Sequence, residues 1–183
     1  MKRPIQMSHD FLEEILHADA VTVDATMGNG YDTLFLAQHS KKVYAFDIQE
    51  KALEATQKRL TQANITNAHL HLVGHEQLSE YVLEPVSAAI FNLGYLPNAD
   101  KTCITKAQTT IAAIQALEVL LVPGGRIAIM VYDGHDGGDD EKEALEAYLE
   151  ALDQQMFTVT RYQTMNQINH PPYLLMVEKH KRG

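Results

Sequence analysis

Asp24-Ala25-Thr26-Met27-Gly28-Asn29-Gly30-Tyr31-Asp32-Thr33 is a glycine-rich turn between two apolar segments. The segment before it, residues 20–23, has the pattern of a buried strand, and the segment after it, residues 34–37, has that of a helix start. A strand that runs through such a turn into a helix is typical of the site where an α/β protein binds a nucleotide-like cofactor. Gly28 and Gly30 allow the backbone to turn sharply and to approach a ligand, although a tight turn without a ligand has the same pattern.

The two ends of this turn indicate which cofactor it binds. Thr33 stands where dinucleotide-binding turns place a third glycine beside the pyrophosphate, which argues against a nicotinamide or flavin cofactor. Asp24 starts the turn, and its carboxylate suits an ammonium group better than a phosphate because like charges repel. S-adenosylmethionine carries an ammonium and a sulfonium group and no phosphate, so we expect it to be the cofactor.

The composition is that of an ordinary globular protein. A chain of 183 residues, 45% of them hydrophobic and 21% charged, predicts one domain over residues 1–183. No apolar run has the length of a membrane span and no secretory signal is recognisable, so we expect a cytoplasmic protein with no membrane partner. The single Cys103 excludes a multi-cysteine zinc site, and no metal is expected. The net charge of −9 argues against binding nucleic acid by bulk electrostatics, although a local basic surface is compatible with it.

Apolar, β-branched stretches alternate along the chain with segments of helical periodicity. The predicted strands are Val21–Asp24, Lys42–Asp47, His69–Val73, Ala88–Leu93, Arg126–Tyr132, Phe157–Gln163 and Tyr173–Glu178. The predicted helices are His9–His17, Asp32–His39, Gln49–Ala63, Glu76–Leu83, Thr102–Leu121 and Asp139–Gln155. Pro123-Gly124-Gly125 is expected to end the longest helix.

This alternation predicts a parallel sheet with helices on both faces. Only residues 164–172 separate the last two predicted strands, which is too short for a helical crossover, so these strands should pair antiparallel. The predicted fold class is α/β, with a Rossmann-like, seven-stranded, mostly parallel sheet whose last strand is antiparallel. This is the layout of class I methyltransferases, whereas a dinucleotide-binding sheet normally ends in parallel strands.

Further cofactor contacts are expected where the next strands end. Asp47 lies about 20 positions beyond the turn, where an acidic residue accepts hydrogen bonds from ribose hydroxyls, although it could instead cap the following helix. His75 follows the third strand and is placed to line the adenine side of the pocket, or could be an exposed cap residue. The residues expected to bind the cofactor are Asp24, Thr26, Gly28, Asn29, Gly30, Asp32, Asp47, Gln49, His75, Glu76 and Asn92.

Asn92-Leu93-Gly94-Tyr95-Leu96-Pro97 follows the fourth predicted strand, at the edge of the sheet where α/β enzymes place the reacting groups. It partly matches the Asn-Pro-Pro-Tyr motif of amino-group methyltransferases, with Leu93-Gly94 in place of the two prolines. In that motif the Asn oxygen accepts a hydrogen bond from the amine and aims the nitrogen lone pair along the S–CH3 bond. We expect Asn92 to orient the amine and Tyr95 to stack on a base, although a turn with a core tyrosine would have a similar pattern.

Two later polar loops are candidates for contact with the substrate. Residues 132–138, after the fifth predicted strand, hold His135, which could bind a phosphate or base or take a proton from the amine, or could do neither. Residues 166–172 are rich in amides that suit base edges, or form a rigid hairpin turn. The expected substrate-binding residues are Tyr95, Tyr132, His135, Asn166 and Asn169, and the expected catalytic residues are Asn92, Tyr95 and His135.

Together these motifs resemble one small bacterial family, the tRNA 5-(aminomethyl)-2-thiouridine methyltransferases, formerly labelled rRNA methylases. The resemblance covers about residues 21–179, and Asp133 departs from it because many members have a proline there. It implies methyl transfer from S-adenosylmethionine to the aminomethyl nitrogen of a wobble uridine in tRNA, by a homodimer that binds the anticodon stem-loop. It also implies that Asn29, Asp32, Asp47, Gln49, His75 and Glu76 hold the cofactor, and that Asn92, Tyr95, Tyr132 and His135 meet the anticodon loop.

Three alternatives remain open at the level of the sequence. The same cofactor could serve methylation of an rRNA base amine or of a small-molecule amine. The chain could be an RNA-binding module that holds the cofactor without catalysis. A nicotinamide oxidoreductase is disfavoured by Thr33 and by the antiparallel ending of the sheet.

Overall fold

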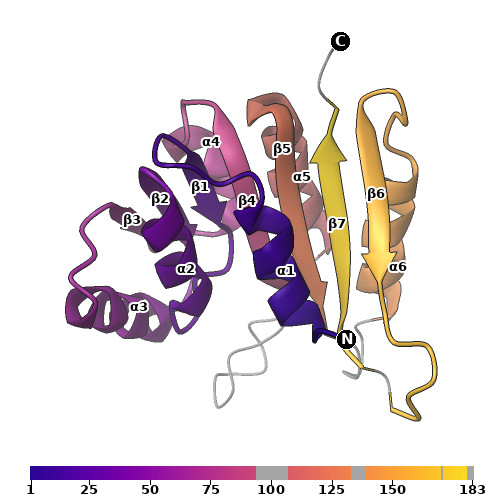
Figure 1. Ribbon diagram of the computed structural model, residues 1–183, viewed down its shortest axis with the longest axis horizontal. Coiled ribbons are helices and arrows are strands. Elements are labelled where there is room, and N and C mark those ends of the chain that lie inside the picture. The colour runs from indigo at the N-terminus through magenta and orange to yellow at the C-terminus, as the bar shows by residue number, and fades with distance from the viewer. Residues whose placement is uncertain (94–106, 133–138, 170, 181–183) are drawn as a thin grey trace.

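The computed structural model describes residues 1–93, 107–132, 139–169 and 171–180 (Figure 1). The strands are β1 (Val21–Asp24), β2 (Lys42–Phe46), β3 (Ala68–His71), β4 (Val86–Leu93), β5 (Leu121–Val131), β6 (Phe157–Tyr162) and β7 (Tyr173–Lys179). The helices are α1 (Pro4–Glu13), α2 (Tyr31–His39), α3 (Glu50–Gln62), the 3-10 turn η1 (His75–Gln77), α4 (Leu78–Tyr81), α5 (Ala107–Leu120) and α6 (Asp139–Glu150). In the described part of the chain, no helix is both long and apolar enough to cross a membrane.

The strands form one seven-stranded sheet in the order β3-β2-β1-β4-β5-β7-β6. The pairs β1–β2, β2–β3, β1–β4 and β4–β5 are parallel, and β7 runs antiparallel to both of its neighbours, β5 and β6. The predicted fold class is confirmed, including the antiparallel return. Because the strand order reverses at β1, between β2 and β4, the crevice at the carboxyl ends of these strands is the place where open α/β sheets bind ligands.

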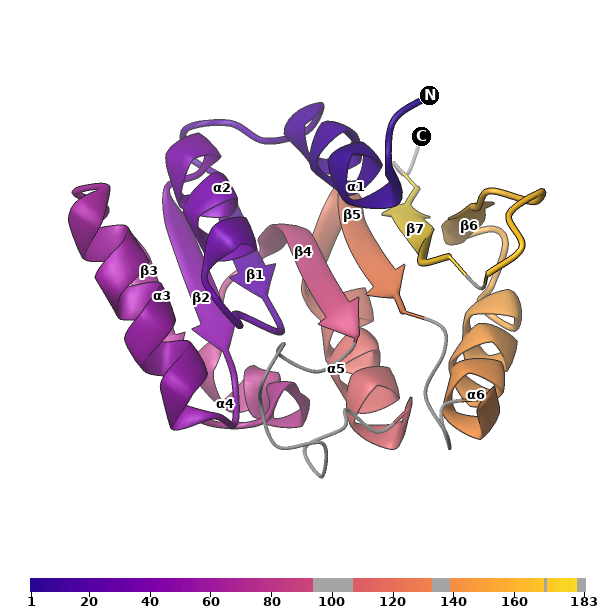
Figure 2. The same cartoon turned by 90° about the horizontal axis from the view of Figure 1, so that it is seen from below.

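Helices cover both faces of the sheet, α1 to α3 on one face and α4 to α6 on the other (Figure 2). The side chains of β4 alternate between the two cores, with Ala88 and Ile90 packed toward the first group of helices and Ala89 and Phe91 toward the second. All four are fully buried, as the period of two in a strand requires when both faces are covered. β4 is thus a rigid support for the residues at its carboxyl end.

Several elements differ in extent from the prediction. The first helix spans Pro4–Glu13 and not His9–His17, because Pro4 suits the first helical position, where no intrahelical N–H bond is lost. β5 starts at Leu121, so the strand includes residues 123–125, which were expected only to end the helix. The ladder between β4 and β5 is irregular there, since Leu121 pairs with Val86 but Arg126 pairs with Ala88. The predicted helix 76–83 is a 3-10 turn followed by the single turn of α4.

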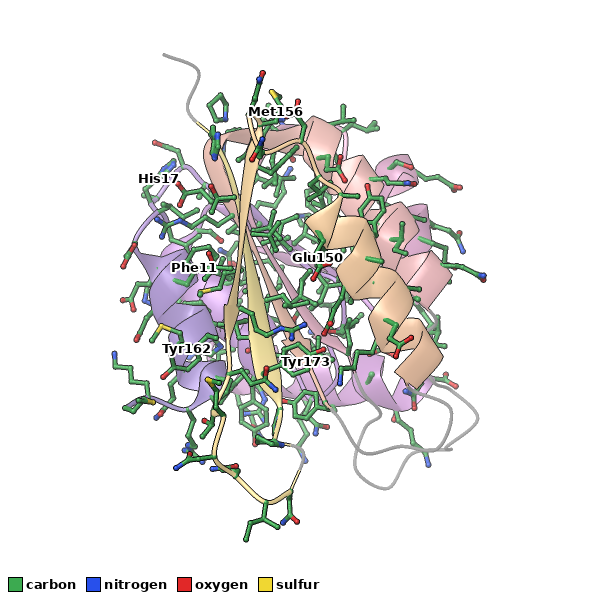
Figure 3. The ribbon with its side chains drawn as sticks, turned by 90° about the vertical axis from the view of Figure 1, so that its right-hand side faces the viewer. Phe11, His17, Glu150, Met156, Tyr162 and Tyr173 are labelled. Atoms are coloured by element: carbon green, nitrogen blue, oxygen red, sulfur yellow. The ribbon has the colours of Figure 1, made fainter. Side chains whose placement is uncertain are left out.

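Arg126 of β5 fixes helix α1 to the sheet. The Arg126 guanidinium donates from Nη1 to the carbonyl oxygen of Phe11 (2.6 Å) and from Nε to Oε2 of Glu178 (2.7 Å), and it lies over the Phe11 ring. The Tyr162 hydroxyl of β6 donates to the carbonyl of Lys2 (2.7 Å). Figure 3 shows Phe11 and Tyr162 on the α1 side of β6 and β7, opposite Glu150 of α6. These contacts fix where the residues of α1 lie relative to the carboxyl ends of the strands.

Candidate active site

The turn after β1 is organised around a buried carboxylate. Asp24 is fully buried, and its Oδ1 accepts a hydrogen bond from the backbone N–H of Thr26 (3.1 Å). Its Oδ2 accepts one from the hydroxyl of Thr33 (2.6 Å), the residue at the position of the third glycine. Thr33 therefore does more than replace a glycine. It lies in α2, and its hydroxyl fixes the carboxylate of Asp24 at the start of the glycine-rich turn.

The pKa of Asp24 is raised from 3.8 to about 7, chiefly by burial and further by the nearby negative charge of Asp32. The hydrogen bonds from Thr33 and Thr26 act in the opposite direction, because they favour the ionised form. At neutral pH the Asp24 carboxyl is thus close to its titration midpoint. A cation bound beside it would favour loss of its proton.

Asp47 links the end of β2 to the glycine turn. Its Oδ2 accepts a hydrogen bond from the backbone N–H of Gly28 (3.1 Å), and its Oδ1 accepts one from Gln49 (3.0 Å). The N-cap of α3 is Gln49, so Asp47 lies before the helix and is not its cap residue. Each carboxylate oxygen has a second lone pair, which leaves Asp47 able to accept hydrogen bonds from ribose hydroxyls. Its role toward the cofactor stays a prediction.

The conformation of the turn requires glycine at Gly28 and Gly30, whose φ angles are 48° and 76°. A Cβ on Gly30 would lie 2.8 Å from Thr56 Oγ1 and 2.9 Å from Thr56 Cα on α3. The Thr56 hydroxyl donates to the carbonyl of Gly28 (3.1 Å). The close neighbour of Gly30 is thus α3, so the absent side chain makes room for the helix, whereas the sequence interpretation gave that space to a ligand.

Asn29 and Tyr31 are held from α3 by Arg59, a residue that the sequence motifs did not single out. Arg59 Nε donates to the carbonyl of Asn29 (2.7 Å), and the guanidinium lies 3.6 Å from the centre of the Tyr31 ring. Tyr31 is 64% exposed, so this stack forms part of the outer surface beside the turn. Arg59 thus fixes the carbonyl direction at the centre of the turn.

His75, in the 3-10 turn after β3, is buried and is not an exposed cap residue. Its Nδ1 lies 2.9 Å from the carbonyl oxygen of Ala25, which can only accept, so Nδ1 carries the proton. Burial lowers the pKa of His75, and the neutral ring then has an acceptor at Nε2, which is buried without a hydrogen-bond partner among the described residues. Glu76, the next residue, is exposed.

Asn92 at the end of β4 is held by the glycine turn and by α2. Its backbone N–H donates to the hydroxyl of Thr26 (2.6 Å), and its side-chain Nδ2 donates to the carboxylate of Asp32. The hydroxyl of Tyr132, at the end of β5, donates to Asn92 Oδ1 (3.3 Å). Burial, and then the charge of Asp32, raise the pKa of Tyr132, so it stays a hydroxyl donor at neutral pH. Residues from three strand ends and α2 thus meet at Asn92.

His9 of α1 completes this group, and sequence analysis missed it. Its Nε2 lies 2.6 Å from Asp32 Oδ1, and its ring is stacked parallel on Phe35 with centroids 4.0 Å apart. His9 precedes β1 and belongs to no strand end or glycine turn, so no motif indicated it. The sequence held no signal for His9, because the contact that positions its helix, from Arg126 to Phe11, joins residues that are far apart in the chain.

Of the five expected substrate-binding residues, Tyr132, Asn166 and Asn169 lie within the described part of the chain. Tyr95 and His135 are outside the described residues. Asn166 and Asn169 are exposed in the connection between β6 and β7, which extends past the end of the sheet in Figure 3. Their roles remain predictions.

The charges of the site fit a cationic ligand. Asp24, Asp32 and Asp47 lie close together, because the negative charges of Asp32 and Asp47 both raise the pKa of Asp24. The Gly28 amide already donates to a carboxylate, so it does not offer the free N–H that a pyrophosphate would need. This donor and charge pattern fits the ammonium and sulfonium of S-adenosylmethionine, and it disfavours a dinucleotide. Among the described residues, no group of three or more His, Cys, Asp or Glu side chains is arranged to hold a metal ion.

Comparisons with known proteins show which family this chain resembles. The sequence profile of the family described as "Putative rRNA methylase" matches residues 43–178. A curated relative from Arabidopsis thaliana, named tRNA (mnm(5)s(2)U34)-methyltransferase, chloroplastic, is 34% identical over 192 residues, which cover 97% of this chain and 70% of that protein.

Two solved structures are similar over nearly the whole chain. A protein from Streptococcus mutans described as "a putative methyltransferase", in complex with SAH, is 54% identical with a TM-score of 0.93, over 98% of this chain and 99% of that one. A protein from Clostridium thermocellum described as a "putative rRNA-methylase" is 41% identical with a TM-score of 0.95, over 98% of each chain. With the sheet order and the carboxylate-lined turn, these matches show that the chain belongs to the rRNA methylase family of class I S-adenosylmethionine-dependent methyltransferases.

Proposed function

We propose that this enzyme transfers the methyl group of S-adenosylmethionine to the aminomethyl nitrogen of a wobble 5-aminomethyl-(2-thio)uridine in tRNA. The observation that carries the proposal is Asn92 at the carboxyl end of β4, whose Nδ2 is engaged by Asp32 and whose Oδ1 is therefore turned the other way. An amide oxygen at that edge suits an amine acceptor. The name of the Arabidopsis relative supports the choice of tRNA and of the wobble base.

On the cofactor side, S-adenosylmethionine supplies a methyl group on a positively charged sulfur. Asp24, Asp32 and Asp47 give the pocket a negative charge that favours this cation, and Thr26, Gly28 and Gly30 shape the turn around them. Asn29, Gln49, His75 and Glu76 line the same edge of the sheet, and the free acceptor at His75 Nε2 suits an amino group of the adenine. Asn92 completes this set, and it is also the residue that orients the proposed amine acceptor.

On the acceptor side, the residues must present a neutral amine. An aliphatic amine has a reference pKa near that of lysine, about 10, so it must lose a proton before attack. Asn92 is not basic, and its Oδ1 orients the amine by accepting one N–H. The base expected from the sequence is His135, and Tyr95 is expected to stack on the uridine, with Tyr132, Asn166 and Asn169 contacting the loop.

The proposed partner is the anticodon stem-loop of tRNA, bound by residues 1–183 as one domain in a cytoplasmic homodimer. The net charge of −9 is compatible with this because a single-stranded loop is recognised by stacking and by hydrogen bonds to base edges. The repulsion between the acidic protein and the RNA phosphates is then confined to a few nucleotides.

Two measurements test the proposal. Nucleoside mass spectrometry of tRNA from a deletion strain should show accumulation of the aminomethyl uridine and loss of its methylated form. The purified enzyme should methylate tRNA that carries the aminomethyl group and leave an unmodified transcript unchanged. Asn92→Ala should lose turnover and keep cofactor binding, while Gln57→Ala, which removes an exposed amide on α3, should behave as wild type.

The family description favours a second candidate, methylation of an rRNA base amine. Incubation of total RNA from the deletion strain with the purified enzyme and methyl-labelled cofactor separates the two candidate functions. Label in rRNA and not in tRNA would replace the proposal with this candidate, and label in neither RNA would indicate a small-molecule amine. Tight cofactor binding without turnover on any amine would indicate a binding module.

A further inference from the structure

We infer that His9 of α1 is a positioning residue that fixes which end of the Asn92 side chain faces the methyl acceptor. The inference rests on the proposed amine acceptor and adds a residue from outside the sheet to its machinery. It starts from the hydrogen-bond chain His9–Asp32–Asn92–Tyr132, in which each side chain contacts the next.

The orientation of an asparagine amide is decided by what its two ends contact. An ionised carboxylate only accepts, so the end of Asn92 that faces Asp32 must be Nδ2. Oδ1 then points to the other side, where the Tyr132 hydroxyl donates to it. An amine that is to attack a methyl group must direct its lone pair at the carbon and donate its N–H bonds elsewhere. Oδ1 accepts such a bond, whereas a flipped amide would present a competing donor.

This orientation holds only while Asp32 stays a fixed acceptor. Asp32 is buried, and its negative charge lies close to the carboxyl of Asp24. If the Asp32 carboxylate rotated away from Asn92, the amide would be free to flip. The hydrogen bond from His9 Nε2 at 2.6 Å holds Oδ1 of Asp32, so that Oδ2 remains directed at Asn92.

His9 is itself held in place on two sides. Its ring is stacked on Phe35 of α2, and α1 is tied to β5 by the Arg126 bond to Phe11. The neighbouring Ser8 and Leu12 are fully buried, so α1 cannot rotate about its axis without exposing them. The position of His9 is therefore set by packing that does not involve the cofactor turn.

The test uses the full-length enzyme with tRNA that carries the aminomethyl group. His9→Phe keeps an aromatic ring on Phe35 and removes the hydrogen bond. We expect kcat to fall at least tenfold, with KM for the cofactor and for tRNA changed less than threefold. His9→Gln keeps a donor and should retain kcat within threefold of wild type. His39→Phe is the matched control, because His39 also contacts Phe35 but not Asp32, and it should leave kcat unchanged.

Chemical rescue provides a second readout that a purely structural role would not give. His9 is partly exposed, so imidazole added to His9→Ala can enter the vacated position beside Phe35 and should restore at least a third of the lost kcat. This arm also applies if His9→Phe does not fold. Wild-type kcat in His9→Phe, an equal loss in His9→Gln, a loss confined to KM, or absence of rescue would each overturn the inference. Failure of the wild-type enzyme to methylate this tRNA would instead refute the proposed function, and the inference with it.

Discussion

The hydroxyl of Thr33 donates a 2.6 Å hydrogen bond to Oδ2 of Asp24, and both residues are completely buried. The bond joins the first turn of α2 to the end of β1 across the glycine turn. A glycine at this position would leave that oxygen without its donor. Thr33, whose presence in the sequence argues against a dinucleotide, is thus also the residue that fixes the Asp24 carboxylate.

Thr33→Val removes this hydroxyl at nearly constant shape, so it should leave a buried carboxyl oxygen without its donor. We expect the free energy of unfolding at pH 7 to fall by about 1–3 kcal/mol. Urea denaturation measures the change. Thr33→Ser keeps the hydroxyl and serves as the control, with a smaller loss that reflects only the missing methyl group. Equal losses in the two variants would show that packing, and not the hydrogen bond, matters here.

Asp24→Asn should change the pH dependence of stability. The folded-state pKa of Asp24 is about 7 and its reference value is 3.8, so the folded protein binds more protons between these values and loses stability as pH rises through this window. Asparagine cannot ionise. Relative to wild type, the unliganded variant should therefore gain about 2–3 kcal/mol between pH 5 and pH 8.

Thermal or urea unfolding without cofactor at these two pH values measures that gain. Cofactor affinity of Asp24→Asn should fall in the same preparations, because the negative charge that favours the cation is removed. A difference from wild type that is the same at pH 5 and pH 8 would contradict the raised pKa.

Gly30→Ala and Asn64→Gly should have opposite effects on stability. Gly30 has φ +76° and no room for a Cβ beside Thr56, so alanine should cost about 1–2 kcal/mol for the backbone alone and more for the contact. Asn64 follows α3 with φ 56°, where the N–H of Ile65 bonds to Leu60 (2.9 Å) in a Schellman-type helix end that favours glycine. Asn64→Gly should therefore gain up to about 1 kcal/mol.

Urea denaturation of both variants tests these signs, and the cofactor affinity of Asn64→Gly should match wild type. If Gly30→Ala left stability unchanged, the close approach of α3 to the turn would not be required by the sequence.

Arg126→Met should release α1 from the sheet without disturbing β1 or β4. It removes the bonds to Phe11 and Glu178 while keeping a long apolar side chain against the Phe11 ring. We expect amide hydrogen exchange in α1 to accelerate at least tenfold, which is a loss of about 1.4 kcal/mol in local stability. Glu14→Gln weakens only an exposed ion pair with Arg126 and should change exchange little. Protection of α1 that matches wild type in Arg126→Met would show that apolar packing alone holds the helix.

Sequence patterns were most informative where the chemistry is local. The turn between β1 and α2 and the short connection before β7 depend on neighbouring residues, and both predict the observed topology. The first helix starts at Pro4 and not at His9, because a proline suits the first helical position. The start of β5 was placed too late because Pro123 was expected to end the helix before it.

The parts of the site that no pattern indicated are contacts between distant segments. His9 reaches Asp32 from α1, and Arg59 reaches Asn29 from α3. The close approach of Thr56 to Gly30 was not predicted for the same reason, since Thr56 is far away in the sequence. Short-range rules describe a residue's own backbone, whereas such contacts depend on how whole elements pack.

The anchoring of α1 has a consequence for how the enzyme is made. A ribosome synthesises α1 before its hydrogen-bond partners in β5 and β6, which are Arg126 for Phe11 and Tyr162 for Lys2. While the nascent chain is short, the helix has an apolar face and no sheet to cover, and closing such long loops is slow. The glycine turn can form as soon as β1, β2 and β4 have been synthesised, but His9 can settle against Asp32 only after β5 has emerged. Helix α1 is thus synthesised before the strands that hold it, yet it is among the last parts of the active site to be put in place.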